Sequence, residues 1–338
     1  MAYQGNCHCG RYRFDLHVDR GGDDNGDDNT QKTRDVTASI PIVTCTCVAC
    51  TKLGCLWHVV TKGHLVDTSN NTNEDSISSS NNFNNVNNDG TLPSPSSSST
   101  SSPLLTTYRS GLVRYEFCSA CGTGLFATHV KGPLVGQKLV NLRTIRGLNP
   151  FHYPRTSTDS SLSPDSPSSL DSSDSGSSTT EKPLPTTGAC LCGSVTVELL
   201  IPLASMPLKE DNCSICTRNA WLGAYPRRAQ VVVRGAQHTR DYRFGRRRFM
   251  GHPFCTTCGA HVFMNVYGPP QDMIDRMPEA KKELVRQNLD VMPINVRILD
   301  RIQKHMGSLA VAQSDEGTEG YERDVLGIVE GKTKGDVK

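Results

Sequence analysis

The sequence has no excess of charge of one sign and no long apolar run. Its 338 residues include 36 lysines and arginines against 34 aspartates and glutamates, which gives a formal net charge of +2. This balance does not favour DNA, RNA or an anionic membrane as a partner, because those surfaces select strongly basic proteins. No uninterrupted apolar stretch approaches the ~20 residues that a membrane-spanning helix needs. We therefore expect no membrane partner, and the charge balance disfavours a nucleic-acid partner.

The sequence also lacks the pattern of a secretory signal, since residues 1–7 contain no basic segment followed by an apolar one. We therefore expect a cytoplasmic protein, with the nucleus as an alternative compartment. The length suits roughly two domains of ~100–200 residues each.

What the sequence has in abundance is cysteine. Of the 14 cysteines, all except Cys55 belong to local clusters. A disulfide framework usually joins distant segments, and the neighbours in a C-x-C pair cannot bridge each other without strain. Close pairs in a reducing compartment more often bind metal, and the spacing here favours that interpretation. Cys55 is expected to be a small buried apolar residue.

The second half of the sequence repeats the pattern of the first. Five blocks recur in the same order, and residues 5–10, 45–52, 108–110, 117–122 and 141–143 correspond to residues 188–193, 211–218, 242–244, 254–259 and 295–297. This recurrence predicts two homologous domains, residues 1–153 and residues 188–305. The first copy is longer between its blocks, so it carries insertions in loops, where added residues cost least.

Low-complexity segments separate the ordered blocks. Residues 19–36 and 67–103 are polar inserts that are expected to be disordered, because they bury too little apolar surface to offset the entropy of ordering. Residues 154–187, rich in Ser, Pro and Asp, are expected to be a linker. Residues 306–338 are expected to be a polar C-terminal tail. Residues 278–286 predict a short helix with proline at its start.

Each predicted domain has a C-x-C pair near its start and a C-x-x-C-Gly turn near its end. Four thiolates saturate tetrahedral zinc, so these sets are predicted to be structural zinc sites. They consist of Cys7, Cys9, Cys118 and Cys121 in the first domain, and of Cys190, Cys192, Cys255 and Cys258 in the second. His8 lies between two of these cysteines and is not expected to be a ligand, because a spacer in a tight metal loop usually points outward.

Cys45, Cys47 and Cys50 form a different kind of set, which we call the three-cysteine set. Three thiolates on Zn²⁺ leave one position for water or for an exogenous thiol, which zinc would hold as a reactive thiolate. The alternative is a structural zinc completed by a nearby side chain such as His58 or His64. The residues alone leave both interpretations open.

Residues 11–16 alternate between polar and apolar side chains, as in a half-buried strand, and residues 56–60, 125–130 and 139–143 are also expected to be strands. The ordered motifs Gly-x-Cys-x-Cys-Gly, Cys-x-Cys-x-x-Cys, Phe-Cys-x-x-Cys-Gly and Asn-x-Arg resemble the glutathione-dependent formaldehyde-activating enzyme family, which also includes centromere protein V-like proteins. The resemblance covers both domains without the inserts, linker and tail. It implies a mainly β fold, with two tandem small zinc-binding β-sheet domains.

The resemblance implies a carbon–sulfur lyase-like enzyme that acts on a glutathione or other thiol adduct. Glutathione would be a co-substrate that adds to formaldehyde to give S-hydroxymethylglutathione. Cys45, Cys47 and Cys50 would be the catalytic metal ligands in the first domain. A different hypothesis is a non-catalytic zinc module for protein or nucleic-acid contact, because one fold and site recur across functions.

The second copy departs from the family pattern where Asp211 replaces the cysteine that corresponds to Cys45. We call Asp211, Cys213 and Cys216 the Asp211 set. A carboxylate can ligate zinc but is harder than a thiolate. We therefore expect three firmly held zinc ions, a fourth held more weakly by the Asp211 set, and weakened or lost catalysis in the second domain.

Basic residues near the cysteines suggest anion binding. Lys52 and Arg218 occupy matching positions just after the two cysteine clusters. A cation there would lower a thiol pKa and could bind a substrate carboxylate, and the alternative is a surface-exposed side chain. Five arginines precede the second C-x-x-C turn: Arg240, Arg243, Arg246, Arg247 and Arg248. They are interpreted as a solvated strand edge rather than an anion site, because no regular aromatic interleaving accompanies them.

Overall fold

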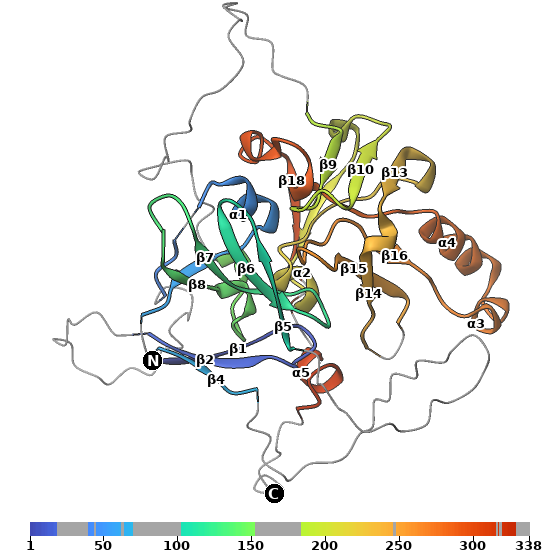
Figure 1. Ribbon diagram of the computed structural model, residues 1–338. Coiled ribbons are helices and arrows are strands. Elements are labelled where there is room, and N and C mark those ends of the chain that lie inside the picture. The colour runs from blue at the N-terminus through green and yellow to red at the C-terminus, as the bar shows by residue number, and fades with distance from the viewer. Residues whose placement is uncertain are drawn as a thin grey trace, which may run out of the picture.

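The structure is a computed structural model that describes residues 1–18, 40–43, 45–61, 64–69, 103–152, 184–245, 248–315, 317 and 320–328 (Figure 1). The insert expected at residues 19–36 lies outside these residues, as do most of residues 67–103 and 154–187. Among the described residues, no helix combines the length and the apolarity needed to cross a membrane.

The first half of the described chain forms two antiparallel sheets, with strand orders β1-β2-β4 and β3-β8-β7-β6-β5. The strands are β1 (Ala2–Asn6), β2 (Arg13–His17), β3 (Trp57–Val59), β4 (Leu65–Asp67), β5 (Leu105–Arg109), β6 (Val113–Cys118), β7 (Gly124–His129) and β8 (Lys138–Asn141). A short helix, α1 (Val48–Leu53), precedes β3. The four segments expected to be strands all contain one, although β3 and β8 each end a residue or two before the expected boundary.

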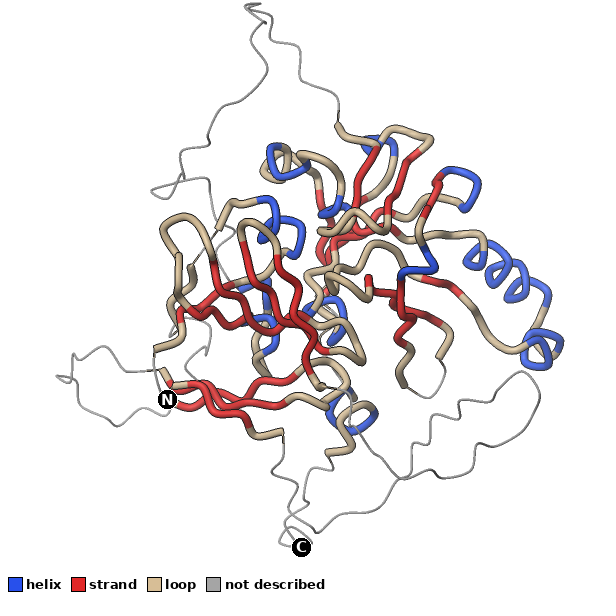
Figure 2. Tube along the Cα trace, in the orientation of Figure 1, coloured by secondary structure: helices blue, strands red, loops and turns tan. Residues whose placement is uncertain are grey.

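The second half has a corresponding arrangement in which the strands fall into three sheets. Figure 2 marks the strands of both halves in red. The strands of the second half are β9 (Thr187–Ala189), β10 (Thr196–Leu199), β11 (Leu208–Asp211), β12 (Leu222–Ala224), β13 (Val231–Arg234), β14 (Thr239–Tyr242), β15 (Met250–Cys255), β16 (Asn265–Val266), β17 (Ile294–Asn295) and β18 (Val311–Ser314). The order β3-β8-β7-β6-β5 of the first half reappears in two parts, as β12-β17 and β16-β15-β14, which a bridge between Phe263 and Ile294 connects. The predicted mainly β fold is confirmed.

The described part of the second half also contains α-helices. They are α2 (Ser214–Arg218), α3 (Gln271–Asp275), α4 (Glu279–Leu289) and α5 (Tyr321–Asp324). The helix predicted at residues 278–286 corresponds to α4, where Pro278 is the residue before the first turn and the helix continues to Leu289.

The C-terminal segment is more ordered than the expected polar tail. β18 pairs in parallel with β11 at the edge of a sheet. α5 lies beside the strands β1 and β2 of the first half (Figure 1). Its Tyr321 is only 5% exposed, and the hydroxyl accepts a hydrogen bond from Asn6 and donates one to the backbone oxygen of His8. A single buried aromatic residue therefore ties the end of the described chain to its beginning.

The two halves meet through their C-x-x-C turns. The rings of Phe117 and Phe254 pack edge to face, with centroids 6.3 Å apart. Gly122 and Gly259 both have positive φ, at 74° and 73°. A Cβ on Gly122 would lie 2.4 Å from the Phe254 ring, and one on Gly259 would lie 2.5 Å from the Phe117 ring. Each turn therefore requires its glycine for two reasons: the backbone has positive φ, and a side chain would collide with the phenylalanine of the opposite half.

Candidate metal centres

Both four-cysteine sets come together in space. In the first half, Sγ of Cys9 lies 3.5 Å from Cys7 and 3.6 Å from Cys118. In the second half, Sγ of Cys192 lies 3.5 Å from both Cys190 and Cys255. Zn–S bonds of about 2.3 Å in a tetrahedron separate two sulfur atoms by roughly 3.8 Å, so the spacing in both sets fits zinc. Each set would tie the first strand of its domain to the turn that follows β6 or β15.

The three-cysteine set lies at the start of α1. Cys47 caps this helix, and its sulfur accepts the N–H of Cys50 at 3.5 Å. The indole N–H of Trp57 donates to Sγ of Cys50 at 3.2 Å. Cys50 and Trp57 are buried, whereas Cys45 and Cys47 are half-buried. The thiols of Cys45 and Cys47 are therefore partly accessible, whereas the buried sulfur of Cys50 is held in place by the hydrogen bond from Trp57.

His129, at the end of β7, joins these three cysteines. Its Nε2 lies 3.5 Å from Sγ of Cys50, and the four donor atoms all lie within 4.8 Å of one another. Zn–S and Zn–N bonds of about 2.3 and 2.0–2.1 Å in a tetrahedron separate S and N by roughly 3.5 Å, so this donor group fits zinc.

Neither histidine considered from the sequence belongs to this donor group. Nδ1 of His58 lies 2.8 Å from the backbone oxygen of Pro41. His64 directly precedes β4. The interpretation that named these two residues is corrected, because His129 reaches the site from a strand that lies 79 residues beyond Cys50. No local spacing marks it, and the signal that could have found it is its position at the end of a predicted strand.

The neighbouring thiols shift one another's ionisation. Hydrogen bonds from Cys45, and then from Cys50, lower the pKa of Cys47 far below its usual range. The same contacts with Cys45 and Cys47, followed by burial, raise the pKa of Cys50. Cys47 is therefore the thiol of this set that is most readily present as thiolate.

The Asp211 set also brings its donors within 4.8 Å, but in a different arrangement. Sγ of Cys213 lies 2.9 Å from Sγ of Cys216. Asp211 accepts the backbone N–H of Cys213 at 2.7 Å and forms an ion pair with Lys209 at 3.3 Å. The residue that corresponds to His129 is Val266, since Val266 pairs with the first residue of β15 as His129 pairs with the first residue of β6. This site therefore lacks both the third thiol and the imidazole.

Lys52 and Arg218, which were predicted to bind a substrate carboxylate, instead connect the two halves. Lys52 donates to the backbone oxygen of Ala189 at 2.9 Å and lies 3.6 Å from Asp300. Arg218 is 5% exposed, donates to the backbone oxygen of Asn6 at 3.2 Å, and lies over the ring of Tyr321. The structure thus assigns Arg218 to the interface, because its guanidinium is enclosed by protein.

His8 is also buried at this interface, contrary to the outward orientation expected of a spacer residue. Its Nδ1 lies 2.9 Å from the hydroxyl of Tyr242 and its Nε2 lies 3.0 Å from the hydroxyl of Ser214. Burial, followed by the charge of Arg218, lowers the pKa of His8, so the ring is neutral near pH 7. The expectation that it is not a ligand agrees with these contacts.

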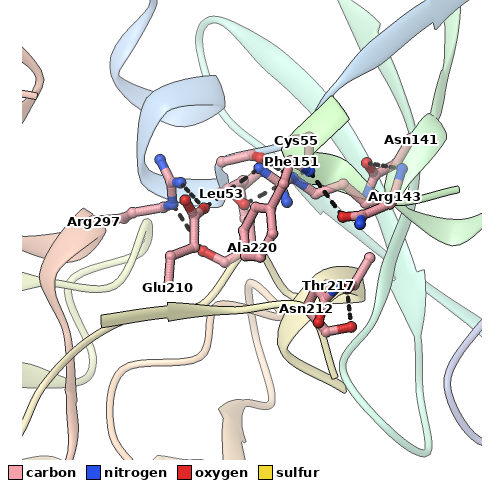
Figure 3. Close-up of polar contacts among 12 residues, drawn as sticks. Leu53, Cys55, Asn141, Arg143, Phe151, Glu210, Asn212, Thr217, Ala220 and Arg297 are labelled. Carbon is pink, nitrogen blue, oxygen red and sulfur yellow. Dashed lines mark hydrogen bonds and ion pairs between the residues drawn. The ribbon is translucent and has the colours of Figure 1, made fainter. Parts of the chain in front are cut away.

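A symmetric pair of arginines supports the two cysteine helices (Figure 3). Arg143 donates to the backbone oxygen of Gly54 at 2.8 Å, directly after α1. Arg297 donates to the backbone oxygen of Ala220 at 2.8 Å, directly after α2. Both guanidinium groups face Glu210, at 3.9 and 2.9 Å. The Asn-x-Arg motif is therefore a support of the cysteine helices.

Cys55 lines a small cavity of about 10 Å³ between the halves, together with Lys52 and Arg218. Cys55 is half-buried rather than buried as predicted, and desolvation raises the pKa of its thiol to about 12. In the basic cluster, Arg240 donates to the backbone oxygen of Ser119, and Arg243 pairs with Asp241. Residues 246 and 247 lie outside the described part of the chain.

Two β-domains with matching four-cysteine sets, each with further cysteines at the start of a short helix, define a tandem β-protein whose cysteine groups can hold zinc. Residues 185–277 match the model of the family described as glutathione-dependent formaldehyde-activating enzyme. The match confirms, for the second half, the resemblance noted from the motifs.

Two further comparisons were made with known proteins. A crystal structure of a Rhodobacter sphaeroides protein is 27% identical over 38% of this chain and 99% of its own, with a TM-score of 0.28. No curated protein matches the chain.

Proposed function

We propose that the first half of the protein catalyses the reversible addition of glutathione, or of another small thiol, to formaldehyde or a related aldehyde at the three-cysteine set. The observation that carries this proposal is the donor group of Cys45, Cys47, Cys50 and His129, in which two thiols are half-buried rather than enclosed. The family match of residues 185–277 supports a thiol-related function for the fold. The Asp211 set lacks the corresponding donors, so the activity is assigned to the first half.

The three cysteines, with His129, would hold Zn²⁺, which lowers the pKa of a bound thiol so that it reacts as thiolate near neutral pH. In this role His129 Nε2 would accept the proton of the incoming thiol and would return it to the aldehyde oxygen as the new carbon–sulfur bond forms. Trp57 fixes Cys50 from below through its 3.2 Å hydrogen bond, and Cys45 and Cys47 leave the approach of the thiol open.

The second candidate function is a non-catalytic zinc module. It is favoured by the same histidine, because three cysteines and one imidazole saturate tetrahedral zinc and such closed sites are structural. The two candidates differ in whether His129 yields its position to a thiol. Under either candidate we propose a small molecule or a protein as partner in the cytoplasm or nucleus, since the charge balance gives no support for a membrane.

A test uses the full-length chain with Co²⁺ in place of zinc, and with zinc for the rate measurement. The enzyme proposal expects glutathione to change the visible Co²⁺ spectrum and to accelerate exchange between formaldehyde and its glutathione adduct, observed by NMR. Cys47→Ser should abolish both effects, whereas the matched variant Cys213→Ser should retain them. A spectrum that glutathione leaves unchanged, together with no acceleration of exchange, would establish the structural module instead.

A further inference from the structure

The two sulfurs of the Asp211 set lie closer together than two zinc-bound thiolates do. Sγ of Cys213 and Sγ of Cys216 are 2.9 Å apart, whereas a tetrahedral zinc site separates two thiolates by roughly 3.8 Å. The sulfur pairs of the four-cysteine sets lie at 3.5 to 3.6 Å, close to the zinc value. The two sulfurs of the Asp211 set therefore contact each other directly and are not spaced around a shared metal position.

The third residue of this set is already engaged by the protein. One carboxylate oxygen of Asp211 accepts the N–H of Cys213 at 2.7 Å, and the other pairs with Lys209 at 3.3 Å. The Cys213 sulfur makes no capping hydrogen bond to its helix, unlike the sulfur of Cys47 in the first half. Asp211 holds the turn that precedes α2, and the thiol of Cys213 is left to contact Cys216.

The two thiols differ in access. Cys213 is half-buried, whereas Cys216 is 8% exposed and packs in an apolar cluster with Ile215, Trp221 and Met264. Thiol–disulfide exchange needs one accessible thiol to attack and a second thiol nearby to resolve the mixed disulfide. The pair supplies both roles within one turn of chain.

We propose that Cys213 and Cys216 form a redox-active dithiol that exchanges with a small disulfide such as oxidised glutathione. The Cys213 thiolate attacks one sulfur of the disulfide, forms a mixed disulfide and releases one glutathione. Cys216 then attacks the Cys213 sulfur, closes the Cys213–Cys216 disulfide and releases the second glutathione. Two electrons pass to the small disulfide, and the two thiol protons are taken up by the departing glutathiones. This inference does not depend on the activity proposed for the first half.

The test exposes the zinc-loaded, full-length protein to mixtures of reduced and oxidised glutathione, followed by alkylation and mass spectrometry. The peptide with Cys213 and Cys216 is expected to lose both alkylation sites and to carry an internal disulfide, which returns to the dithiol as reduced glutathione increases. Cys47 and Cys50 have the same spacing at the start of α1 and serve as the internal control. They should remain free of disulfide in the same sample.

Two variants separate the roles of the thiols. Cys216→Ser should accumulate a glutathione adduct on Cys213, whereas Cys213→Ser should accumulate none on the buried Cys216. The proposal is overturned if the unmodified chain keeps both residues as alkylatable thiols at every glutathione ratio. It is equally overturned if both residues resist alkylation until a chelator removes zinc, because they would then be metal ligands. Neither outcome bears on the exchange assay of the first half.

Discussion

At the scale of single residues, two positions separate the cysteine helices of the two halves. The first half has Cys45 and His129, and the second half has Asp211 and Val266 in their places. The sequence alone shows the first exchange, because it falls inside a repeated motif. The exchange of His129 for Val266 appears only when the strands of the two halves are aligned. His129 contacts Cys50 in space, although the two residues are 79 positions apart in the sequence. The donor group was therefore predictable in its thiols but not in its imidazole.

Replacing His129 by glutamine tests the role of the imidazole. The account expects the three thiols to retain zinc, while the thiol–aldehyde exchange rate falls about 100-fold, because a positioned proton acceptor contributes roughly 10²–10⁴-fold. Zinc content and exchange by NMR would be measured on the same preparation. Val266→Gln is the matched control, which should leave both quantities unchanged. The contrary result has two parts: His129→Gln loses the zinc of the three-cysteine set completely, and the parent chain does not accelerate exchange. Together they would support a non-catalytic, structural zinc site.

At the scale of elements, local patterns were the reliable guides. The C-x-x-C-Gly turns, the alternating strands and the helix after Pro278 are all determined by neighbours in the sequence, and the structure confirms the β fold that they predict. β18 and α5 lie in residues 306–338, which were expected to be a polar tail, and β18 is held there by pairing with the distant strand β11. Burial of a single residue such as Tyr321 depends on a distant partner, here Asn6 and Arg218, which no local pattern reveals.

Removing Tyr321 tests whether α5 belongs to the folded structure. Tyr321→Ala should lower the free energy of unfolding by about 3 kcal/mol, since it deletes a buried aromatic ring. Tyr321→Phe keeps the ring and loses the two hydroxyl hydrogen bonds, so a loss of about 1–2 kcal/mol is expected. Urea unfolding of the zinc-loaded chain measures both. A Tyr321→Ala variant as stable as the parent would show that this contact does not form in solution.

At the scale of the whole molecule, the second half packs against the first and supports its cysteine helix. Phe117 and Phe254 each pack on the glycine of the opposite turn, and Arg143 and Arg297 share Glu210 beneath the two cysteine helices. Through these reciprocal contacts the second half supports the cysteine helix of the first half, although its own cysteine set is incomplete. Lys52 and Arg218, predicted as substrate ligands, are used in the same interface.

The central claim is that zinc occupies the two four-cysteine sets and the three-cysteine set, whereas the Asp211 set carries a dithiol. Zinc per chain in the purified full-length protein, measured by elemental mass spectrometry, tests it most directly. The account predicts three zinc ions, which fall to two in the double variant Cys47→Ser/Cys50→Ser and stay at three in Cys213→Ser/Cys216→Ser. Four zinc ions in the parent, with one lost from the second double variant, would contradict it.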